Sequence, residues 1–360
     1  MSSDSTQIRL SSTGSYPRVS DNPESQLLER TAISFNRGER TSADLLDAQN
    51  TVTRRAISEQ VKAGLEIITD GQIRWNDPIS HLAAKLDNVG LQDSLPFFHT
   101  TKLFRQPIFS GKPSRRGPLV VDEYSFARNA LGHLPTPPGK AGKLAIKPVL
   151  MGPYTLAKLS ASEAQQKNGS GGHRASLEER VQACAEILAL EIDALAQSGA
   201  HLIQIDEPSI LKHPEDWTVF EAAIDHLAES RDKVRKAGQT LDLALYTYFG
   251  DAFPFYEKLQ SLPLDVLGLD FVSSSTLLEK VASAGSAKSL ALGFIDGCNS
   301  GIENVTAIAK SVDRLLPKVT GTQVFLGTSC GLEYLTAHVA FAKLALLPSV
   351  LAEITGTYKI

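Results

Sequence analysis

Short apolar segments recur along the chain, each followed by a polar turn and then by a helical pattern of apolar positions. Apolar and β-branched runs predict strands, whereas apolar residues three and four apart predict helices. The predicted strands are Ile8–Thr13, Glu66–Thr69, Lys147–Met151, Leu202–Ile205, Leu241–Tyr246, Asp265–Leu269, Ser289–Ile295 and Gln323–Gly327. Eight repeats favour an α/β fold with a (β/α)8 TIM barrel over residues 1–360, and an open doubly wound sheet is the alternative.

The clearest predicted helix begins after Ser176. Ser176 and Glu179 form a capping box, in which each side chain can satisfy a free backbone N–H group. Apolar residues then recur on one face of the helix, which is typical of packing against a core. These residues are Leu177, Val181, Cys184, Leu188, Ile192 and Leu195. Cys184 is therefore predicted to be a core residue.

Two segments interrupt the alternation of strands and helices. About 75 residues separate the second and third strands, more than one crossover helix needs. We predict an insertion over residues 86–140 with a projecting β-hairpin, formed by Thr100–Phe109 and Pro118–Ser125. Residues 161–175 are glycine-rich and are predicted to form a mobile loop. A lid over a site and a plain surface linker are both open for this loop.

Polar and reactive residues follow the predicted strands. A parallel barrel gathers these strand ends around one mouth. A single Asp after a strand is more often a helix cap than a catalytic residue. Helix capping does not, however, explain a cysteine at each of two successive strand ends. The residues at the strand ends are Gly14, Ser15, Tyr16, Asp70, Gln72, Gly152, Asp206, Glu207, Tyr246, Tyr248, Asp270, Asp296, Cys298, Thr328, Ser329 and Cys330.

Asp206 and Glu207 form the most informative pair. They end the apolar run Ile203–Ile205 and are closed off by Pro208. Adjacent carboxylates raise one another's pKa, so that one of the two can donate or accept a proton at neutral pH. Both are therefore predicted to be catalytic.

Composition narrows the class of protein. The chain has 360 residues, of which 42% are hydrophobic and 21% charged, with a net charge of −4. This balance does not suggest nucleic-acid binding, and no apolar run reaches the roughly 18 residues of a membrane span. The polar segment Met1–Gln7 lacks the apolar core that a signal peptide has, and three cysteines do not make a disulfide framework. A cytoplasmic enzyme with reduced thiols is expected.

The motifs at the strand ends together carry a resemblance to a known family. In order, they are Gly14–Arg18, Asp70–Trp75, Lys147–Thr155, Ile203–Pro208, Thr247–Gly250, Leu267–Asp270, Gly293–Gly297 and Ser329–Leu332. This pattern, covering residues 10 to 345, resembles the cobalamin-independent methionine synthase family. The chain is similar to its short, single-barrel members, within a superfamily that also includes uroporphyrinogen decarboxylase.

The resemblance implies an S-methyltransferase in methionine biosynthesis that moves a methyl group to homocysteine or a related thiol. It implies a zinc ion that holds the thiol as thiolate, and a folate or methylcobalamin as methyl donor. Asp206 matches the family's contact to the substrate ammonium, and Gly14 and Ser15 match its carboxylate site. The predicted substrate-binding set is Gly14, Ser15, Asp70, Gln72, Asp206 and Tyr246.

The zinc ligands depart from the family pattern. Catalytic members carry a His-x-Cys pair after the fifth strand, where this chain has Tyr246-Thr247-Tyr248. Asp270 and Cys330 stand where the family has an acid and its last Cys, and Cys298 is additional. The predicted metal ligands are therefore Cys330, Asp270 and Cys298. The departures are similar to the non-catalytic first barrel of the long family members.

Two other hypotheses stay open. The chain could be a non-catalytic barrel that acts with a separate catalytic subunit or a corrinoid protein. It could also be a metal-free decarboxylase or lyase of the same superfamily, using Asp206 and Glu207. If the chain is an S-methyltransferase, its expected ligands are a small thiol and a methyl donor, and no nucleic acid or membrane is expected as a partner.

Overall fold

The computed structural model describes residues 7–18, 23–162 and 175–354, and the chain divides into two compact units. Unit 1 comprises Met1–Arg74, Glu123–Lys147 and Leu269–Ile360, whereas unit 2 comprises Trp75–Asp122 and Pro148–Gly268. Strand β10 (Val266–Asp270) has its first three residues in unit 2 and its last two in unit 1.

Parallel strands form the centre of unit 1. β1 pairs with β12, β12 with β11, and β2 with β5, while a bridge between Ser11 and Ile67 links β1 to β2. Leu10, Leu292 and Leu326 are buried in this layer, as expected for strands covered by helices. The strands are β1 (Gln7–Leu10), β2 (Ile67–Ile68), β5 (Ala145–Ile146), β11 (Ser289–Ile295) and β12 (Gln323–Thr328).

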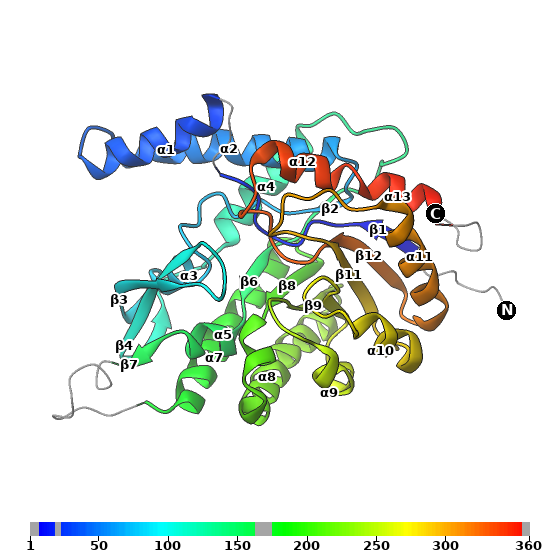
Figure 1. The fold of residues 1–360 in the computed structure, drawn as a ribbon. Helices are drawn as coiled ribbons and strands as arrows, with labels where there is room; N and C mark the ends of the chain where they lie inside the picture. Colours follow the sequence, from blue (N-terminus) through cyan, green and yellow to red (C-terminus); the bar gives the residue numbers. More distant parts are fainter. Residues whose placement is uncertain (1–6, 19–22, 163–174, 355–360) are drawn as a thin grey trace. The chain divides into compact units, whose positions relative to one another are not determined.

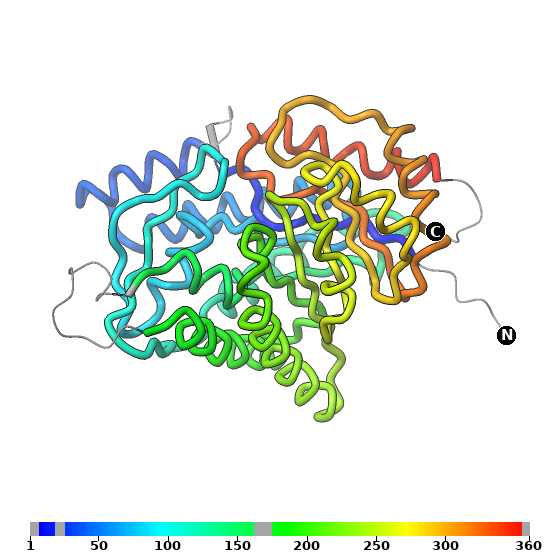
Figure 2. The backbone as a smooth tube through the Cα atoms, turned by 60° about the horizontal axis from the view of Figure 1, so that its bottom comes forward, coloured from blue at the N-terminus to red at the C-terminus, as the bar shows by residue number. Residues whose placement is uncertain are grey.

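Helices accompany the strands of unit 1. The two blue helices α1 and α2 run side by side in both Figure 1 and Figure 2. α2 begins with a capping box between Thr41 and Asp44 and buries Val52 and Ile57. The helices are α1 (Pro23–Asn36), α2 (Ser42–Lys62), α4 (Val121–Gly132), α10 (Leu277–Ala284), α11 (Val305–Leu315), η4 (Leu316–Lys318), α12 (Ala337–Leu344) and α13 (Leu347–Glu353).

Unit 2 continues the same alternation. β6 (Val149–Met151), β8 (Leu202–Asp206) and β9 (Asp242–Thr247) are parallel, with Ile205 opposite both Leu150 and Leu245. The long helices α7 and α8, green in Figure 1, lie side by side. The helices are α3 (Ser80–Ala83), α5 (Pro153–Lys158), α7 (Leu177–Gln197), η1 (Pro208–Lys212), η2 (Pro214–Asp216), α8 (Trp217–Lys236), η3 (Phe253–Phe255) and α9 (Tyr256–Ser261).

The predicted strands and the predicted capped helix are present. All eight predicted segments contain an observed strand. In the third, Lys147–Met151, only β6 is a strand, and Lys147 and Pro148 separate it from β5, which lies just before the predicted segment. Pro148 has no N–H group to donate to a neighbouring strand, which explains the break. Ser176 caps α7 together with Glu179, and Cys184 is fully buried on its apolar face.

The sequence analysis assigned the wrong segments to the strands of the hairpin. The antiparallel pair consists of β3 (Leu86–Pro96) and β4 (Leu103–Arg115), whereas α4 begins within the segment Pro118–Ser125. Most residues of β3 are exposed, and its hydrogen-bonded neighbour is β4 alone. β3 contains no continuous run of apolar or β-branched residues, which is the pattern from which the strands were predicted.

The segment predicted as a mobile loop, 161–175, lies almost entirely outside the described residues. Its first two residues form β7 (Ala161–Ser162), which pairs in parallel with β4.

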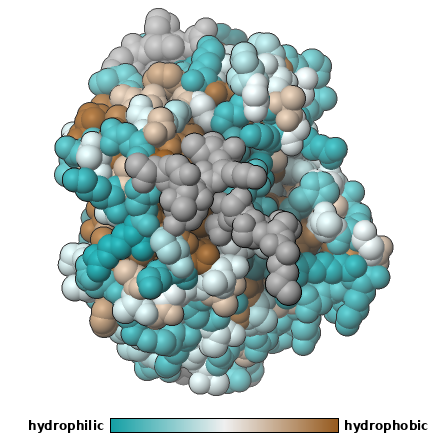
Figure 3. Space-filling view, turned by 90° about the vertical axis from the view of Figure 1, so that its right-hand side faces the viewer, coloured by the Kyte–Doolittle hydropathy of each residue, from teal (hydrophilic) through white to brown (hydrophobic). Residues whose placement is uncertain are grey.

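Hydrophobic side chains on the surface are dispersed. On the face in Figure 3, hydrophilic residues dominate, with small groups of hydrophobic ones between them. Large exposed apolar side chains among the described residues include Leu103, Leu190 and Ile302, which come from distant parts of the chain. Within the described ranges, no helix has the length and apolar character needed to cross a membrane.

Candidate active site

Asp206 is the last residue of β8, and its carboxylate is held by two side chains of unit 2. Gln204 Nε2 donates to Oδ1 at 2.7 Å, and the Tyr248 hydroxyl donates to Oδ2 at 3.1 Å. Only 5% of Asp206 is exposed. The two hydrogen bonds fix the orientation of this buried carboxylate.

Gln204 and Tyr248 were absent from the predicted substrate-binding set, although Tyr248 was among the residues at the strand ends. Gln204 precedes Asp206 by two residues on β8, so that both side chains project from the same face of the strand. That periodicity could have identified Gln204 from the sequence. Tyr248 follows β9, and its contact with Asp206 depends on the pairing of β8 with β9, which places Asp206 opposite Tyr246.

Glu207 points into the backbone at the start of α5. Its two carboxylate oxygens accept hydrogen bonds from the N–H groups of Tyr154 at 2.8 Å and Thr155 at 2.7 Å. A Cβ atom on Gly152 would lie 2.3 Å from the Glu207 carboxylate, so only glycine leaves room for this contact. The arrangement makes Glu207 an anchor between the end of β8 and α5.

Burial raises the pKa of Glu207 to about 7, and the neighbouring charge of Asp206 acts in the same direction. The hydrogen bonds from Tyr154 and Thr155 oppose this change but do not cancel it. The predicted mutual effect of the two acids is therefore present for Glu207, although burial is the larger cause.

This pKa predicts a pH-dependent contribution to stability. Because the folded-state value lies above 4.5, the folded chain binds more protons than the unfolded chain between about pH 4.5 and 7. The contribution of Glu207 is complete below that range and falls by about 3 kcal/mol as the pH rises through it. The Glu207→Gln variant, which stays neutral, is expected to lack this dependence.

Urea unfolding of wild type and Glu207→Gln from pH 4.5 to 8 measures the effect. The free energy of unfolding of wild type minus that of the variant should decrease with rising pH. The carboxyl of Asp70 is present in both proteins, so its titration cancels in the difference. A difference that is constant or increases with pH would contradict the assigned pKa.

Tyr246 packs its ring against the backbone of the neighbouring strand. It is 6% exposed, and a Cβ atom on Gly268 would lie 2.5 Å from its ring. The backbone carbonyl of Tyr246 accepts a hydrogen bond from the Glu207 N–H group at 2.9 Å. Tyr246 therefore helps to hold the chain just after Asp206.

In unit 1, the loops that follow β1, β2 and β12 are hydrogen-bonded to one another. The Tyr16 N–H group donates to the Gly71 carbonyl at 2.9 Å, and the Leu332 N–H group donates to the Ser15 carbonyl at 2.8 Å. A Cβ atom on Gly331 would lie 2.0 Å from Ser15 Oγ. The predicted residues Gly14 and Ser15 are thus brought to the loop that carries Cys330.

Asp70 and Gln72 form a tight turn after β2. The Gln72 N–H group donates to Asp70 Oδ1 at 2.9 Å, and Gln72 has the left-handed backbone angle φ of 51°. Its amide oxygen would lie 3.7 Å from a Cβ atom on Gly14. Burial, with a further contribution from Glu123, raises the pKa of Asp70 to about 6.

Cys298 and Cys330 lie next to each other in unit 1. Their Sγ atoms are 3.6 Å apart, and Cys298 is exposed whereas Cys330 is buried. The hydrogen bond between the thiols lowers the pKa of Cys298 and raises that of Cys330, so Cys298 ionises first. Asp270, also buried, accepts hydrogen bonds from the Val272 and Ser273 N–H groups at 2.9 Å each.

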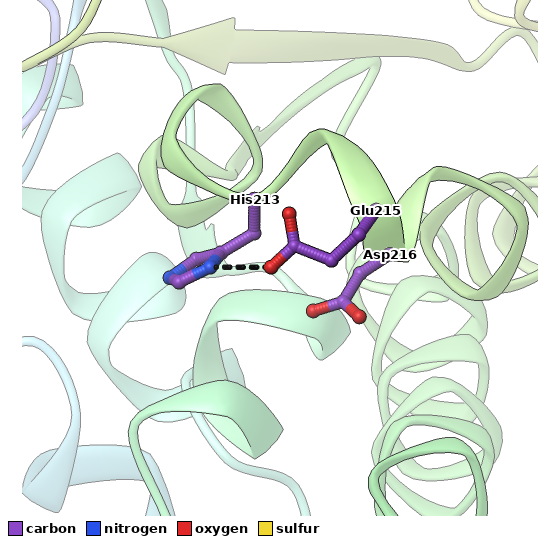
Figure 4. A group of neighbouring side chains, drawn as sticks. All are labelled: His213, Glu215 and Asp216. Carbon is purple, nitrogen blue, oxygen red and sulfur yellow. Dashed lines mark hydrogen bonds and ion pairs between the residues drawn. The ribbon is translucent and has the colours of Figure 1, made fainter.

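A group of residues other than the predicted metal ligands has the interatomic distances of a metal site. Among the described residues, His213, Glu215 and Asp216 are the set whose ligand atoms all lie within 4.8 Å of one another, and Asp270, Cys298 and Cys330 do not form such a set. Figure 4 shows the hydrogen bond between His213 and Glu215, which is 3.1 Å long.

The chemistry around Asp216 does not fit a cation. Its Oδ2 atom accepts hydrogen bonds from Lys158 Nζ and from the Tyr154 hydroxyl, each at 2.7 Å. The ammonium of Lys158 already neutralises this carboxylate, and Glu215 is exposed to solvent. A metal ion would have to displace an ion pair, so we assign no metal to this group.

Comparisons with known proteins agree with the fold. The family model described as "Cobalamin-independent synthase, N-terminal domain" matches residues 133–320. A B12-independent methionine synthase from Shewanella sp. W3-18-1, solved in complex with selenomethionine, superposes with a TM-score of 0.70 at 22% identity, covering 97% of each chain. A methyltransferase from Methanosarcina mazei gives a TM-score of 0.61 at 13% identity, covering 97% of this chain and 94% of its own. The predicted α/β fold of the TIM-barrel type is confirmed.

Similar sequences have nearly the same length. A methionine synthase of Saccharolobus solfataricus is 24% identical over 335 residues, which are 92% of this chain and 90% of the relative. A methionine synthase of Methanothermobacter marburgensis is 27% identical over 333 residues, 92% of this chain and 95% of the relative.

Proposed function

Because the chain belongs to the cobalamin-independent methionine synthase family, we propose that it is an S-methyltransferase that methylates homocysteine or a related thiol. The observation that carries the proposal is the match, over nine-tenths of both chains, to methionine synthases of this short form. The selenomethionine bound by the Shewanella structure supports an amino-acid product of this size and chemistry.

We assign the ammonium of the amino-acid substrate to Asp206. Its carboxylate is buried and oriented by Gln204 and Tyr248, so an incoming ammonium would meet an acceptor that needs no rearrangement. Glu207 then acts as a positioning residue, because both of its oxygens are engaged with the backbone of α5. Tyr246 supports the same stretch of backbone.

Residues of unit 1 are proposed to bind the substrate through their own loops. Gly14 and Ser15 offer backbone and hydroxyl donors for a carboxylate, and the Gln72 amide lies close to Gly14. Asp70 holds the turn that presents Gln72. The pKa of Asp70, about 6, would leave this turn most rigid above that pH, where the acceptor is ionised.

The two thiols fit a zinc ion. Zinc–sulfur bonds of about 2.3 Å in tetrahedral geometry separate two sulfur ligands by about 3.8 Å, close to the observed 3.6 Å. We propose Cys298 and Cys330 as ligands. The third predicted ligand, Asp270, does not lie with both of them at the distances of a metal site, and what it contributes is a negative charge that acts on both thiols. When bound, zinc would lower the pKa of the substrate thiol so that it reacts as thiolate.

Methyl transfer to homocysteine is the test of this proposal. The purified chain is incubated with homocysteine and, in parallel, with methyltetrahydrofolate or methylcobalamin, and methionine is measured. Methionine formation with one donor is expected, together with its loss on chelation and its recovery on adding zinc. No methionine with either donor would overturn the proposal. Methionine formation that chelators leave unchanged would remove zinc from the proposed mechanism.

One observation favours a second function. The matching family model describes the N-terminal domain of the synthases, and the chain lacks a His-x-Cys pair at Tyr246–Tyr248. A barrel that works with a catalytic-half or corrinoid protein would show methyl transfer only when that partner is added. Turnover by the isolated chain would exclude this reading.

A further inference from the structure

The loops that carry Cys298 and Cys330 are held together by more than the two thiols. The Ser329 N–H group donates to the Ile295 carbonyl at 2.7 Å, and the Gly297 N–H group donates to Ser329 Oγ at 3.2 Å. A Cβ atom on Gly297 would lie 2.7 Å from Cys330 Sγ. The close approach of the sulfur atoms is therefore set by the backbone of two adjacent strand ends.

The two thiols differ in their access to solvent. Cys298 is exposed, whereas Cys330 is 1% exposed, and the two sulfur atoms are 3.6 Å apart. An exposed thiol that meets an oxidant first, next to a buried thiol that can attack it, is the arrangement of a peroxidatic and a resolving cysteine. The sulfur atoms would have to approach by about 1.5 Å to form a disulfide bond of about 2.05 Å.

We propose that Cys298 and Cys330 are a reversible oxidation site that closes to a disulfide when a peroxide reacts with Cys298. The Cys298 sulfur attacks hydrogen peroxide, an S–O bond forms, the O–O bond breaks, and the released hydroxide takes up a proton as water. The Cys330 sulfur then attacks the sulfenic sulfur, an S–S bond forms, and the S–O bond breaks to release a second water. Two thiols and one peroxide thus give one disulfide and two waters.

Reduction reverses the change. A dithiol reductant attacks the disulfide, becomes a disulfide itself, and returns both protons to the cysteines. Closing the pair would also remove two sulfur ligands from the proposed zinc site. That consequence alone rests on the proposed function, whereas formation of the disulfide does not.

Peptide mapping of the full chain tests the proposal. The protein, with and without prior chelation, is treated with one equivalent of hydrogen peroxide, alkylated, and digested with trypsin without reduction. Cleavage after Lys and Arg puts Cys298 in peptide 289–310, Cys330 in 319–343 and Cys184 in 181–212. We expect a linked species of the first two peptides, loss of two of the three free thiols, and recovery of both after reduction.

Single substitutions separate this reaction from general oxidation. Cys184→Ala should form the same linked species. Cys298→Ser should keep the buried Cys330 thiol free, and Cys330→Ser should add oxygen to Cys298 instead of forming a link. If wild type gains oxygen at Cys298 without linking, or keeps all three thiols, the proposal is wrong. The mapping on wild type needs no variant to fold, and its result does not depend on methyl transfer.

Discussion

Asp206→Asn is expected to lower kcat/KM for homocysteine by about 10-fold to 150-fold, since a hydrogen bond to a charged group contributes about 1.5–3 kcal/mol. Asparagine keeps the shape but loses the negative charge that would face the substrate ammonium. The asparagine NH2 group would also face a hydrogen-bond donor, either Gln204 Nε2 or the Tyr248 hydroxyl, and could not accept the hydrogen bond that the aspartate accepts. Because ammonium binding serves both the ground state and the transition state, most of the loss should appear in KM.

Steady-state kinetics with varied homocysteine and saturating methyl donor measures this loss. KM for the methyl donor should stay unchanged. Asp242→Asn is the matched control, because Asp242 begins β9 and pairs with Leu202, at the opposite end of β8 from Asp206. Kinetics for Asp206→Asn equal to those of Asp242→Asn would refute the assigned role.

Replacing Cys330 by serine is expected to abolish stoichiometric zinc binding. A serine hydroxyl stays protonated at neutral pH and is a poor ligand compared with a thiolate, so Cys298 would be left as a single sulfur ligand. The zinc content after dialysis should fall from about one per chain to background. Cys298→Ser should also weaken zinc retention, because it removes the other sulfur of the pair at 3.6 Å.

Elemental analysis after dialysis against a zinc buffer measures the content directly. Cys184→Ala is the control, because Cys184 is buried on α7 in unit 2. Circular dichroism and urea unfolding identify a variant that has simply failed to fold. Retention of wild-type zinc by a folded Cys330→Ser protein would remove Cys330 from the ligand set. A wild type that retains no zinc would contradict the metal site while leaving the oxidation of the thiol pair testable.

The hairpin and the strands illustrate different limits of sequence analysis. Strand β11 is an almost continuous apolar segment, because both of its faces are covered, and that pattern is local. β3 is an exposed edge strand without such a pattern, and its partner β4 extends through Gly111 and Pro113, beyond the end of the predicted strand Thr100–Phe109. A buried strand can be recognised in the sequence by its apolar residues, whereas the pairing of an exposed edge strand with its neighbour requires no such residues.

The sequence by itself determined the alternation of strands and helices, the capped helix after Ser176, and the gathering of acids and thiols at strand ends. Each of these depends on residues that are neighbours along the chain or on one face of an element. Only the tertiary structure decided that Tyr248 contacts Asp206, that Glu207 turns to the backbone of α5, and that Cys298 lies 3.6 Å from Cys330. These contacts depend on the register between strands and on the close approach permitted by glycines, which many distant residues set together.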